Sequence, residues 1–215
     1  MYSLSLIHIS RQSGLIDALK ATIVFEPEFA NIDALKGIDA YSHIWLIWGF
    51  SEAKQDIWSP TVRPPRLGGN RRMGVFATRS PFRPNSLGLS CVRLEKLEND
   101  KERGPVLHVT GADLLDRTPI FDIKPYLPYV DSHPEALEGF AGEVKDYALN
   151  VNFPDIYLNK IPHRHIQAVL ALLAQDPRPA YHNDPDRIYG MTYAGYNIRF
   201  FVKGSELTVC GIGPD

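Results

Sequence analysis

The sequence predicts a mainly β protein, with a β-barrel domain followed by a small α+β domain. Short apolar or alternating segments recur along the first part of the chain, and glycines and prolines separate them. Only residues 162–175 have the period of an amphipathic helix, and they lie in the last third of the chain. Because the composition shifts near residues 132–134, we expect the barrel domain to span residues 1–133 and the α+β domain residues 134–215.

The first domain is expected to contain strands at residues 4–9, 22–25, 43–50, 73–77, 87–94 and 106–112. Residues 43–50 are apolar almost without a break, which is typical of a strand buried on both faces. Residues 31–37 begin with an N-cap candidate and end in glycine, so we expect a single helical turn. In residues 87–94 the apolar positions are odd-numbered to Cys91 and even-numbered from Val92. This slip indicates a β-bulge, which barrel walls often need.

The second domain is expected to contain the helix and several strands, at residues 148–153, 188–193, 196–202 and 206–210. On the helix, apolar residues share one face: Ile166, Val169, Leu170 and Leu173. His163 and His165 are two positions apart and point in different directions on a helix, so we interpret them as surface residues rather than metal ligands.

Composition places the chain among soluble globular proteins. Of its 215 residues 44% are hydrophobic and 22% charged, which is enough to bury a core. Its two cysteines, Cys91 and Cys210, have neither a disulfide framework nor zinc-ligand spacing. The N-terminal residues lack the features of a signal peptide, and no apolar run is long enough to span a membrane. We therefore expect a cytoplasmic protein with no bound metal and no membrane contact.

Positive charge is concentrated in one stretch, although the formal net charge of the chain is only −2. Residues 57–94 contain seven arginines and no aspartate or glutamate. Within them, Pro81 and Pro84 stiffen the loop formed by residues 78–85. A rigid loop that carries guanidinium groups is suited to binding phosphate or carboxylate. The alternative is a solvated basic loop paired with acidic residues from elsewhere.

A second loop, at residues 113–126, carries three carboxylates directly after a predicted strand. Aspartate and Thr-Pro are also common in turns, so turn formation alone is an equally good explanation. The chain has no GxSxG, HExxH, CxxC or strand-linked GxGxxG motif, which excludes several common enzyme classes. The residues alone thus predict a β-barrel that binds a zwitterionic or phosphorylated ligand.

Several longer segments resemble the TrmO/YaeB family of tRNA adenosine N6-methyltransferases: residues 41–45, 61–70, 74–88 and 116–128. Residues 176–181 and 196–199 are similar to the C-terminal domain of its bacterial members. The resemblance implies a β-barrel enzyme that uses S-adenosylmethionine and binds it near a homodimer interface. It also implies a tRNA substrate, threonylcarbamoyl-adenosine next to the anticodon, which would be methylated on N6.

The resemblance and the chemistry of the donor together predict the site. The expected donor-binding residues are Gln12, Ser13, Gly14, Ser51, Glu52, Arg79, Ser80, Leu89, Asp113, Leu115, Asp116, Arg117 and Thr118. Asp113 or Asp116 would accept from donor hydroxyls, and Arg79 or backbone N–H groups would bind its carboxylate. The expected tRNA-binding residues are Arg71, Arg72 and Arg83.

Asp122 is the expected base or proton acceptor, and Lys124 would stabilise charge on the carbamoyl oxygen. The alternative for Asp122 is a structural salt bridge.

The chain departs from the family pattern at three places. Arg117 replaces a glycine, so it would be strained if this position requires a positive φ. Ser51 and Glu52 stand where many relatives have histidine, and the loop before Arg11 is shorter than usual. Two alternatives follow: a diverged binding module for RNA or S-adenosylmethionine without turnover, or a methyltransferase that acts on another substrate. The C-terminal domain is expected to assist tRNA binding.

Overall fold

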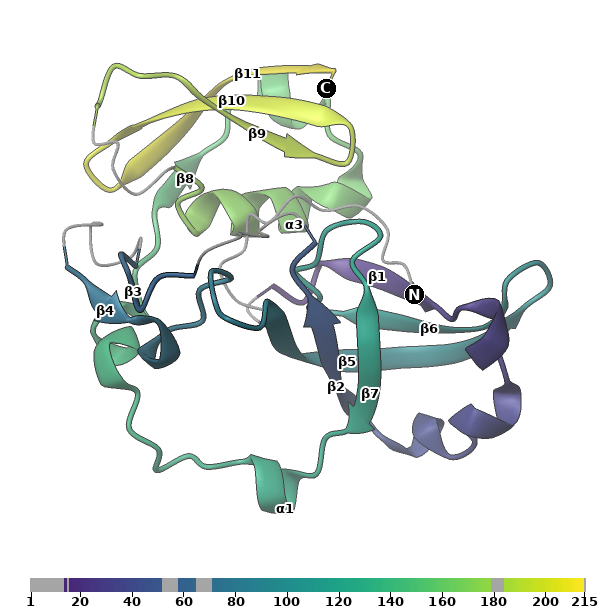
Figure 1. Cartoon of the computed structure of the whole chain (residues 1–215). Helices are drawn as coiled ribbons and strands as arrows, with labels where there is room; N and C mark the ends of the chain where they lie inside the picture. Colours follow the sequence, from purple (N-terminus) through teal and green to yellow (C-terminus); the bar gives the residue numbers. More distant parts are fainter. Residues whose placement is uncertain (1–13, 15, 52–57, 65–70, 179–183, 215) are drawn as a thin grey trace.

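The computed structural model describes residues 14, 16–51, 58–64, 71–178 and 184–214. These residues form two main sheets, and helix α3 (His163–Ala174) runs between them (Figure 1). The protein is therefore mainly β, as predicted. The strand expected at residues 4–9 lies outside the described residues.

Five strands form the N-terminal sheet, in the order β1-β6-β5-β2-β7 with antiparallel neighbours. Their bounds are β1 Lys20–Val24, β2 His43–Gly49, β5 Leu87–Asp100, β6 Gly104–Thr110 and β7 Ile120–Pro125. The long strand β5 pairs with β2 through its first half and with β6 from Arg93 onward. Strand β5 therefore joins the β2–β7 part of the sheet to the β1–β6 part.

The side chains of β5 alternate differently from the prediction. From Leu87 to Leu94 its even-numbered positions face the core, and the register shift lies between Leu94 and Lys96 rather than at residues 91–92. Leu87 and Leu89 are consequently exposed. They are exposed because the ring of Trp48 fills the space on the core side of β5. A Cβ added at Gly88 would lie 2.2 Å from this ring.

In the described part of the chain the sheet has two edges, β1 and β7, so the expected closed barrel is not confirmed. Strand β7 also occupies residues of the predicted loop at 113–126. Its pairing with β2 gives these residues a regular structure despite their turn-like composition. Local turn propensity was a poor guide here because tertiary pairing decides the outcome.

Between β1 and β2 the chain forms three short 3₁₀-helices, η1 Pro27–Phe29, η2 Ile32–Leu35 and η3 Ile38–Ala40. The side chain of Asn31 caps η2 by accepting a hydrogen bond from the Asp33 N–H at 2.9 Å. Gly37 follows with φ of 87°, a conformation that glycine adopts at little cost. The predicted helical turn is confirmed, in 3₁₀ form.

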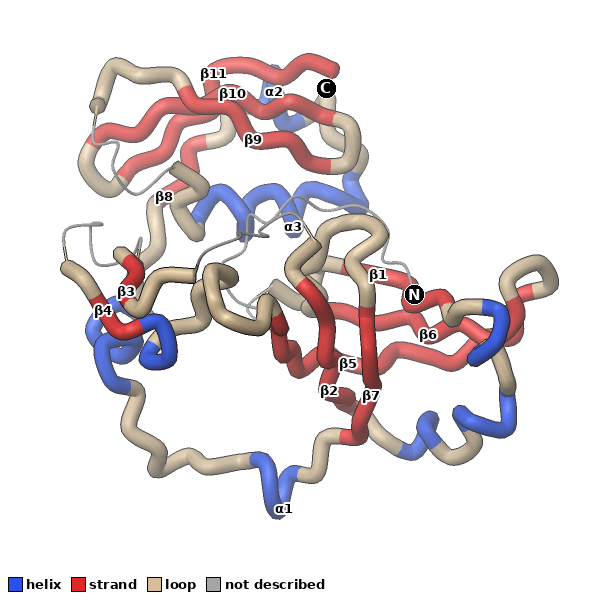
Figure 2. The backbone as a smooth tube through the Cα atoms, in the orientation of Figure 1, coloured by secondary structure: helices blue, strands red, loops and turns tan. Residues whose placement is uncertain are grey.

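A small hairpin lies beside the N-terminal sheet, to the left in Figure 2. It consists of β3 (Thr61–Val62) and β4 (Met73–Gly74), and the short helix η5 (Val75–Ala77) follows it. Val75 is buried, and its N–H donates to the Pro60 carbonyl at 2.9 Å. The hairpin and η5 therefore form one packed unit.

The C-terminal sheet has the order β8-β11-β10-β9 and packs against α3. The bounds are β8 Asn150–Asn152, β9 Tyr189–Tyr193, β10 Tyr196–Lys203 and β11 Glu206–Pro214, and the remaining helices are α1 Pro128–Asp131, η6 Gly139–Val144 and α2 Asp155–Leu158. Ile16 and Leu19 are buried in the same apolar cluster as the α3 side chains. The segment before β1 therefore ties the two halves of the chain together.

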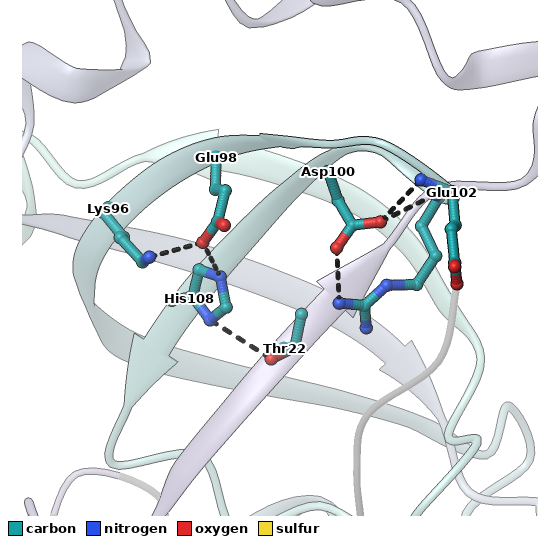
Figure 3. A network of polar contacts seen from close by, with 7 residues as sticks. Thr22, Lys96, Glu98, Asp100, Glu102 and His108 are labelled. Atoms are coloured by element: carbon teal, nitrogen blue, oxygen red, sulfur yellow. Dashed lines mark hydrogen bonds and ion pairs between the residues drawn. The ribbon is translucent and has the colours of Figure 1, made fainter.

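The outer surface of β1, β6 and the second half of β5 is polar. Glu98 accepts from Lys96 and contacts His108 Nε2 at 3.0 Å, and His108 Nδ1 lies 3.3 Å from the Thr22 hydroxyl (Figure 3). The Lys96 hydrogen bond lowers the pKa of the Glu98 carboxyl. Charges on this surface are thus neutralised by their neighbours.

Among the described residues, no helix has the length and apolar character required to cross a membrane.

Candidate functional site

Two of the predicted loops meet at the end of strand β2. The Gly49 N–H donates to the Pro119 carbonyl at 3.0 Å, and the Phe50 N–H donates to the Ser86 carbonyl at 2.9 Å. Pro119 ends the segment 111–119, which we call the aspartate loop, and Ser86 ends the segment 78–86, which we call the arginine loop. Backbone hydrogen bonds therefore hold both loops against the same strand end, on its two sides.

Gly14 joins the start of the aspartate loop. Its N–H donates to the Gly111 carbonyl at 2.9 Å, and a Cβ added at Gly111 would lie 3.3 Å from the Gly14 Cα. Both glycines have a positive φ, so the two backbones approach closely where a side chain would intervene. Gln12 and Ser13, expected beside Gly14, lie outside the described residues.

The aspartate loop has a buried base and an exposed tip. Thr118 is buried, and its hydroxyl donates to the Leu115 carbonyl at 2.7 Å, which closes the turn. Asp113 is also buried, whereas Asp116 and Arg117 are exposed at the tip and Leu115 is partly buried. Thr118 thus shapes the loop, and Asp116 is the carboxylate that it presents to solvent.

Arg117 has φ of 61°, in the left-handed region. The position therefore does require a positive φ. Under this condition we expect an arginine in place of glycine to be strained. An arginine in this conformation carries backbone strain of roughly 1–2 kcal/mol. The strained residue lies in the same turn as Asp116.

The arginine loop is braced by its own side chains. The Thr78 hydroxyl donates to the Val75 carbonyl at 2.9 Å and accepts from the Ser80 N–H at 3.2 Å. Arg83 Nη1 donates to the Val75 and Thr78 carbonyls at 3.1 and 2.7 Å. Arg83, which we expected to bind tRNA, thus uses part of its guanidinium to stabilise the loop. Arg79 is exposed.

The other predicted binding residues lie on several elements. Ser51 is exposed just after β2, and Leu89 is 59% exposed on the outer face of β5. Arg71 and Arg72 are exposed at the β3–β4 hairpin, where Arg72 Nη1 donates to the Thr61 hydroxyl at 3.3 Å. Glu52 lies outside the described residues.

Asp122 and Lys124 form an ion pair on β7, with 2.9 Å between Lys124 Nζ and Asp122 Oδ2. The Asp122 side chain also accepts from the Ile123 N–H at 2.8 Å. The Lys124 hydrogen bond is the main cause that lowers the pKa of Asp122. A lowered pKa weakens a carboxylate as a base, so the ion-pair alternative accounts for what is seen and a role in proton transfer stays a prediction.

Sequence reasoning missed two groups. Trp58 and Phe76 are exposed aromatic residues beside the arginine loop. They belong to the arginine-rich stretch at residues 57–94, which contains no aspartate or glutamate. Arg178 and Asp176 form a buried ion pair after α3, which a short Asp-Pro-Arg sequence does not reveal. The described residues contain no group of three or more histidine, cysteine, aspartate or glutamate side chains placed to hold a metal ion.

Comparison with known proteins identifies the family. Residues 5–132 match the tRNA-methyltransferase O N-terminal domain, and residues 147–215 match the TrmO C-terminal domain. A tRNA (adenine(37)-N6)-methyltransferase from Eikenella corrodens is 49% identical over 170 residues, covering 78% of this chain and 95% of that protein. A protein of the same name from Escherichia coli strain K12 is 38% identical over 216 residues, covering 96% of this chain and 91% of that protein.

The fold agrees with this relationship. A crystal structure of TrmO from Pseudomonas aeruginosa superposes with a TM-score of 0.76 at 31% sequence identity, and the match covers 99% of this chain and 95% of the other. Both halves of the chain, their order and their folds therefore correspond to those of one family. The chain belongs to the TrmO family of tRNA methyltransferases.

Proposed function

We propose that the protein is an S-adenosylmethionine-dependent tRNA methyltransferase that methylates N6 of adenosine 37. Two relatives carry this activity in their names, and this chain covers more than nine tenths of each. The observation that carries the site assignment is the pair of hydrogen bonds from Gly49 and Phe50, because they bring the arginine and aspartate loops to one strand end. As a finer proposal, the adenosine carries a threonylcarbamoyl group.

The residues of the two loops fit S-adenosylmethionine. The exposed guanidinium of Arg79 can pair with its carboxylate, and the exposed carboxylate of Asp116 can accept from its ribose hydroxyls. The close approach of Gly14 and Gly111 leaves backbone where a side chain would otherwise stand, as a bound nucleoside requires. When bound, the donor supplies a methyl group on a positively charged sulfur.

The chain's own residues would act mainly by positioning. Methyl transfer requires an in-line approach of nitrogen to the methyl carbon, and orientation of this kind contributes about 7–11 kcal/mol in favourable cases. The adenosine N6 next to a carbamoyl carbonyl is a poor nucleophile until its proton leaves. We assign the proton to Asp122 Oδ2, and Lys124 Nζ, at 2.9 Å, would then be free to stabilise charge on the carbamoyl oxygen.

The deciding experiment is transfer of a labelled methyl group to total tRNA, followed by nucleoside analysis. Label in N6-methylated threonylcarbamoyl-adenosine supports the whole proposal. Label in another nucleoside or in a small molecule means that the enzyme acts on a different substrate. No label, with S-adenosylmethionine still bound, identifies the chain as a binding module without turnover.

Asp122→Asn tests the proton assignment. We expect the variant to lose turnover and keep its affinity for S-adenosylmethionine, because the change removes a base and leaves the donor-binding loops intact. Asp39→Asn, which alters an exposed carboxylate on η3, is the matched control and should leave both unchanged. If Asp122→Asn turns over like the unmodified enzyme, the proton goes elsewhere.

The proposal includes a cytoplasmic homodimer in which residues 134–215 assist tRNA binding. Three apolar side chains are exposed near the same strand end and support a covering partner: Leu87, Leu89 and Phe121 are 48%, 59% and 62% exposed.

A further inference from the structure

Two aromatic rings stand exposed on the unit formed by the β3–β4 hairpin and η5. Trp58 is 46% exposed and Phe76 is 70% exposed, and their ring centroids lie 6.2 Å apart at an interplanar angle of 35°. Phe76 directly follows Val75, which is 1% exposed and bonded to Pro60. The backbone that carries Phe76 is therefore anchored, although its ring is in solvent.

Arg83 also contacts the Phe76 ring. Its guanidinium carbon lies 5.5 Å from the Phe76 centroid, and Nη1 is fixed by the carbonyls of Val75 and Thr78. A guanidinium held in this way next to an aromatic ring loses little further freedom when a flat ligand stacks beside it. The Trp58, Phe76 and Arg83 side chains form a surface that we call the aromatic platform.

The surroundings of the aromatic platform are cationic. Arg63, Arg71, Arg72 and Arg79 are exposed, and no ion pair between described residues includes any of them. The whole stretch from residue 57 to 94 lacks aspartate and glutamate. Flat aromatic surfaces within a field of exposed arginines match single-stranded nucleic acid, which presents base faces and phosphates together.

We propose that the aromatic platform stacks an unpaired base of the RNA substrate, with Arg71 and Arg72 on the neighbouring phosphates. This inference rests on the proposed function and adds the part of the surface that receives the RNA. An enzyme that modifies a base edge needs that nucleotide out of its stack, and a neighbouring base that stacks on protein helps to keep the loop open. Phe76 precedes Arg79 by three residues, so the platform adjoins the loop assigned to the methyl donor.

Tryptophan fluorescence reports directly on the platform. The chain has three tryptophans: Trp48 is buried, Trp45 is partly buried with its indole N–H bonded to Asp131, and Trp58 is exposed. The probe is a synthetic RNA stem-loop whose loop contains unpaired adenosines, and a fully paired RNA duplex is the comparison. We expect the stem-loop to quench the emission of Trp58, Trp58→Phe to abolish this quenching, and the duplex to cause little.

Affinity for the same stem-loop separates stacking from general attraction. We expect Trp58→Ala and Phe76→Ala each to weaken binding by roughly tenfold, the size expected when one base–aromatic stack is removed. Trp58→Phe keeps a ring and should bind within about twofold of the unmodified protein on the same reasoning. Phe29→Ala removes an aromatic side chain whose exposure of 61% lies between those of Trp58 and Phe76, from η1, and should bind as the unmodified protein does.

Unchanged affinity and absent quenching would overturn the platform. The platform would also be overturned if Trp58→Ala lost binding to anionic lipid vesicles but kept its binding to RNA. A change of oligomeric state in Trp58→Ala would have the same consequence, because each result assigns the surface to another partner. Methyl transfer to tRNA, measured in parallel, keeps the two proposals distinct. If the unmodified protein transfers methyl groups and the alanine variants bind normally, the platform alone fails. If no methyl group is transferred but the alanine variants lose RNA affinity, the platform stands and the proposed activity fails.

Discussion

Arg178 in the C-terminal half and the arginines around the β3–β4 hairpin have the same side chain in opposite settings. Arg178 donates to both carboxylate oxygens of Asp176, at 2.7 and 2.8 Å, and Tyr147 donates to Oδ2 at 2.9 Å. Both charged side chains are about nine tenths buried. Arg71, Arg72 and Arg79 are exposed, and none of them has an acidic partner within the described residues.

The difference separates charge that maintains the fold from charge that is available to a ligand. A buried pair of opposite charges is costly to break, because removing one partner leaves the other in a poor solvent for ions. An exposed arginine without a partner adds little to stability and retains its full attraction for phosphate. Stability and RNA affinity should therefore respond to different arginines.

Asp176→Asn should produce the largest effect on stability. Asparagine tolerates the positive φ of 54° at this position at least as well as aspartate, so the change tests the charge rather than the backbone. We expect a loss of about 3 kcal/mol in the free energy of unfolding, because Arg178 is left buried without its counter-charge. Denaturant unfolding measures the change, and Asp122→Asn, in an exposed ion pair, should lose less than about 1 kcal/mol.

Acid should remove the same contribution. Burial alone would raise the pKa of Asp176, but the hydrogen bonds from Arg178 and Tyr147 outweigh it, and the net pKa is lowered. A carboxyl whose folded-state pKa is depressed stabilises the protein above its unfolded value and loses this contribution as the pH falls through the folded value. The stability difference between the unmodified protein and Asp176→Asn should therefore shrink below about pH 4. A constant difference would mean that Asp176 is not the ionised partner.

The double variant Arg71→Ala/Arg72→Ala should affect RNA binding and leave stability unchanged within about 0.5 kcal/mol. We expect a roughly tenfold weaker affinity for the RNA stem-loop, and a salt dependence of log affinity that is shallower by about 0.7 for each phosphate that the arginines no longer neutralise. Titrations at several salt concentrations measure both quantities.

Lys36→Ala/Lys101→Ala is the matched control, because it removes two exposed positive charges outside the β3–β4 hairpin. Lys36 follows η2, and Lys101 lies in the β5–β6 turn, which is at the opposite side of the molecule from the hairpin in Figure 1. An equal loss of affinity in this control would mean that RNA responds to total charge rather than to the hairpin.

The strongest local signals in the sequence predicted the local structure well. Asn31 and Gly37 bound a helical turn because capping and positive φ act within a few residues. Leu87 and Leu89 misled the prediction because their exposure depends on Trp48, which is distant in the sequence and occupies the inner face. Arg83 could be recognised as basic, but its hydrogen bonds to Val75 and Thr78 depend on the folded loop. Patterns within a segment were thus readable, whereas competition between segments was not.

Arg117 brings the comparison to the aspartate loop, where an exposed arginine also carries strain. Arg117→Gly should raise the free energy of unfolding by about 0.5–1 kcal/mol, because glycine relieves the positive φ but gives the unfolded chain more freedom. Thermal unfolding measures this gain. Ala194→Gly is the matched variant, since Ala194 is exposed with φ of 50° in the turn between β9 and β10.

The two glycine variants should agree in stability and differ in binding only if the Arg117 side chain contacts a ligand. Ala194→Gly lies in the C-terminal sheet, so we expect it to leave the affinity for S-adenosylmethionine unchanged. If Arg117→Gly gains stability and loses donor affinity, the strain at Arg117 is retained for binding, as expected for strained residues at functional sites. If it gains stability with no loss of affinity, Arg117 is a tolerated replacement of glycine. It then neither maintains the fold, as Arg178 does, nor binds a ligand, as the arginines of the β3–β4 hairpin are expected to do. A loss of stability would contradict the backbone argument itself.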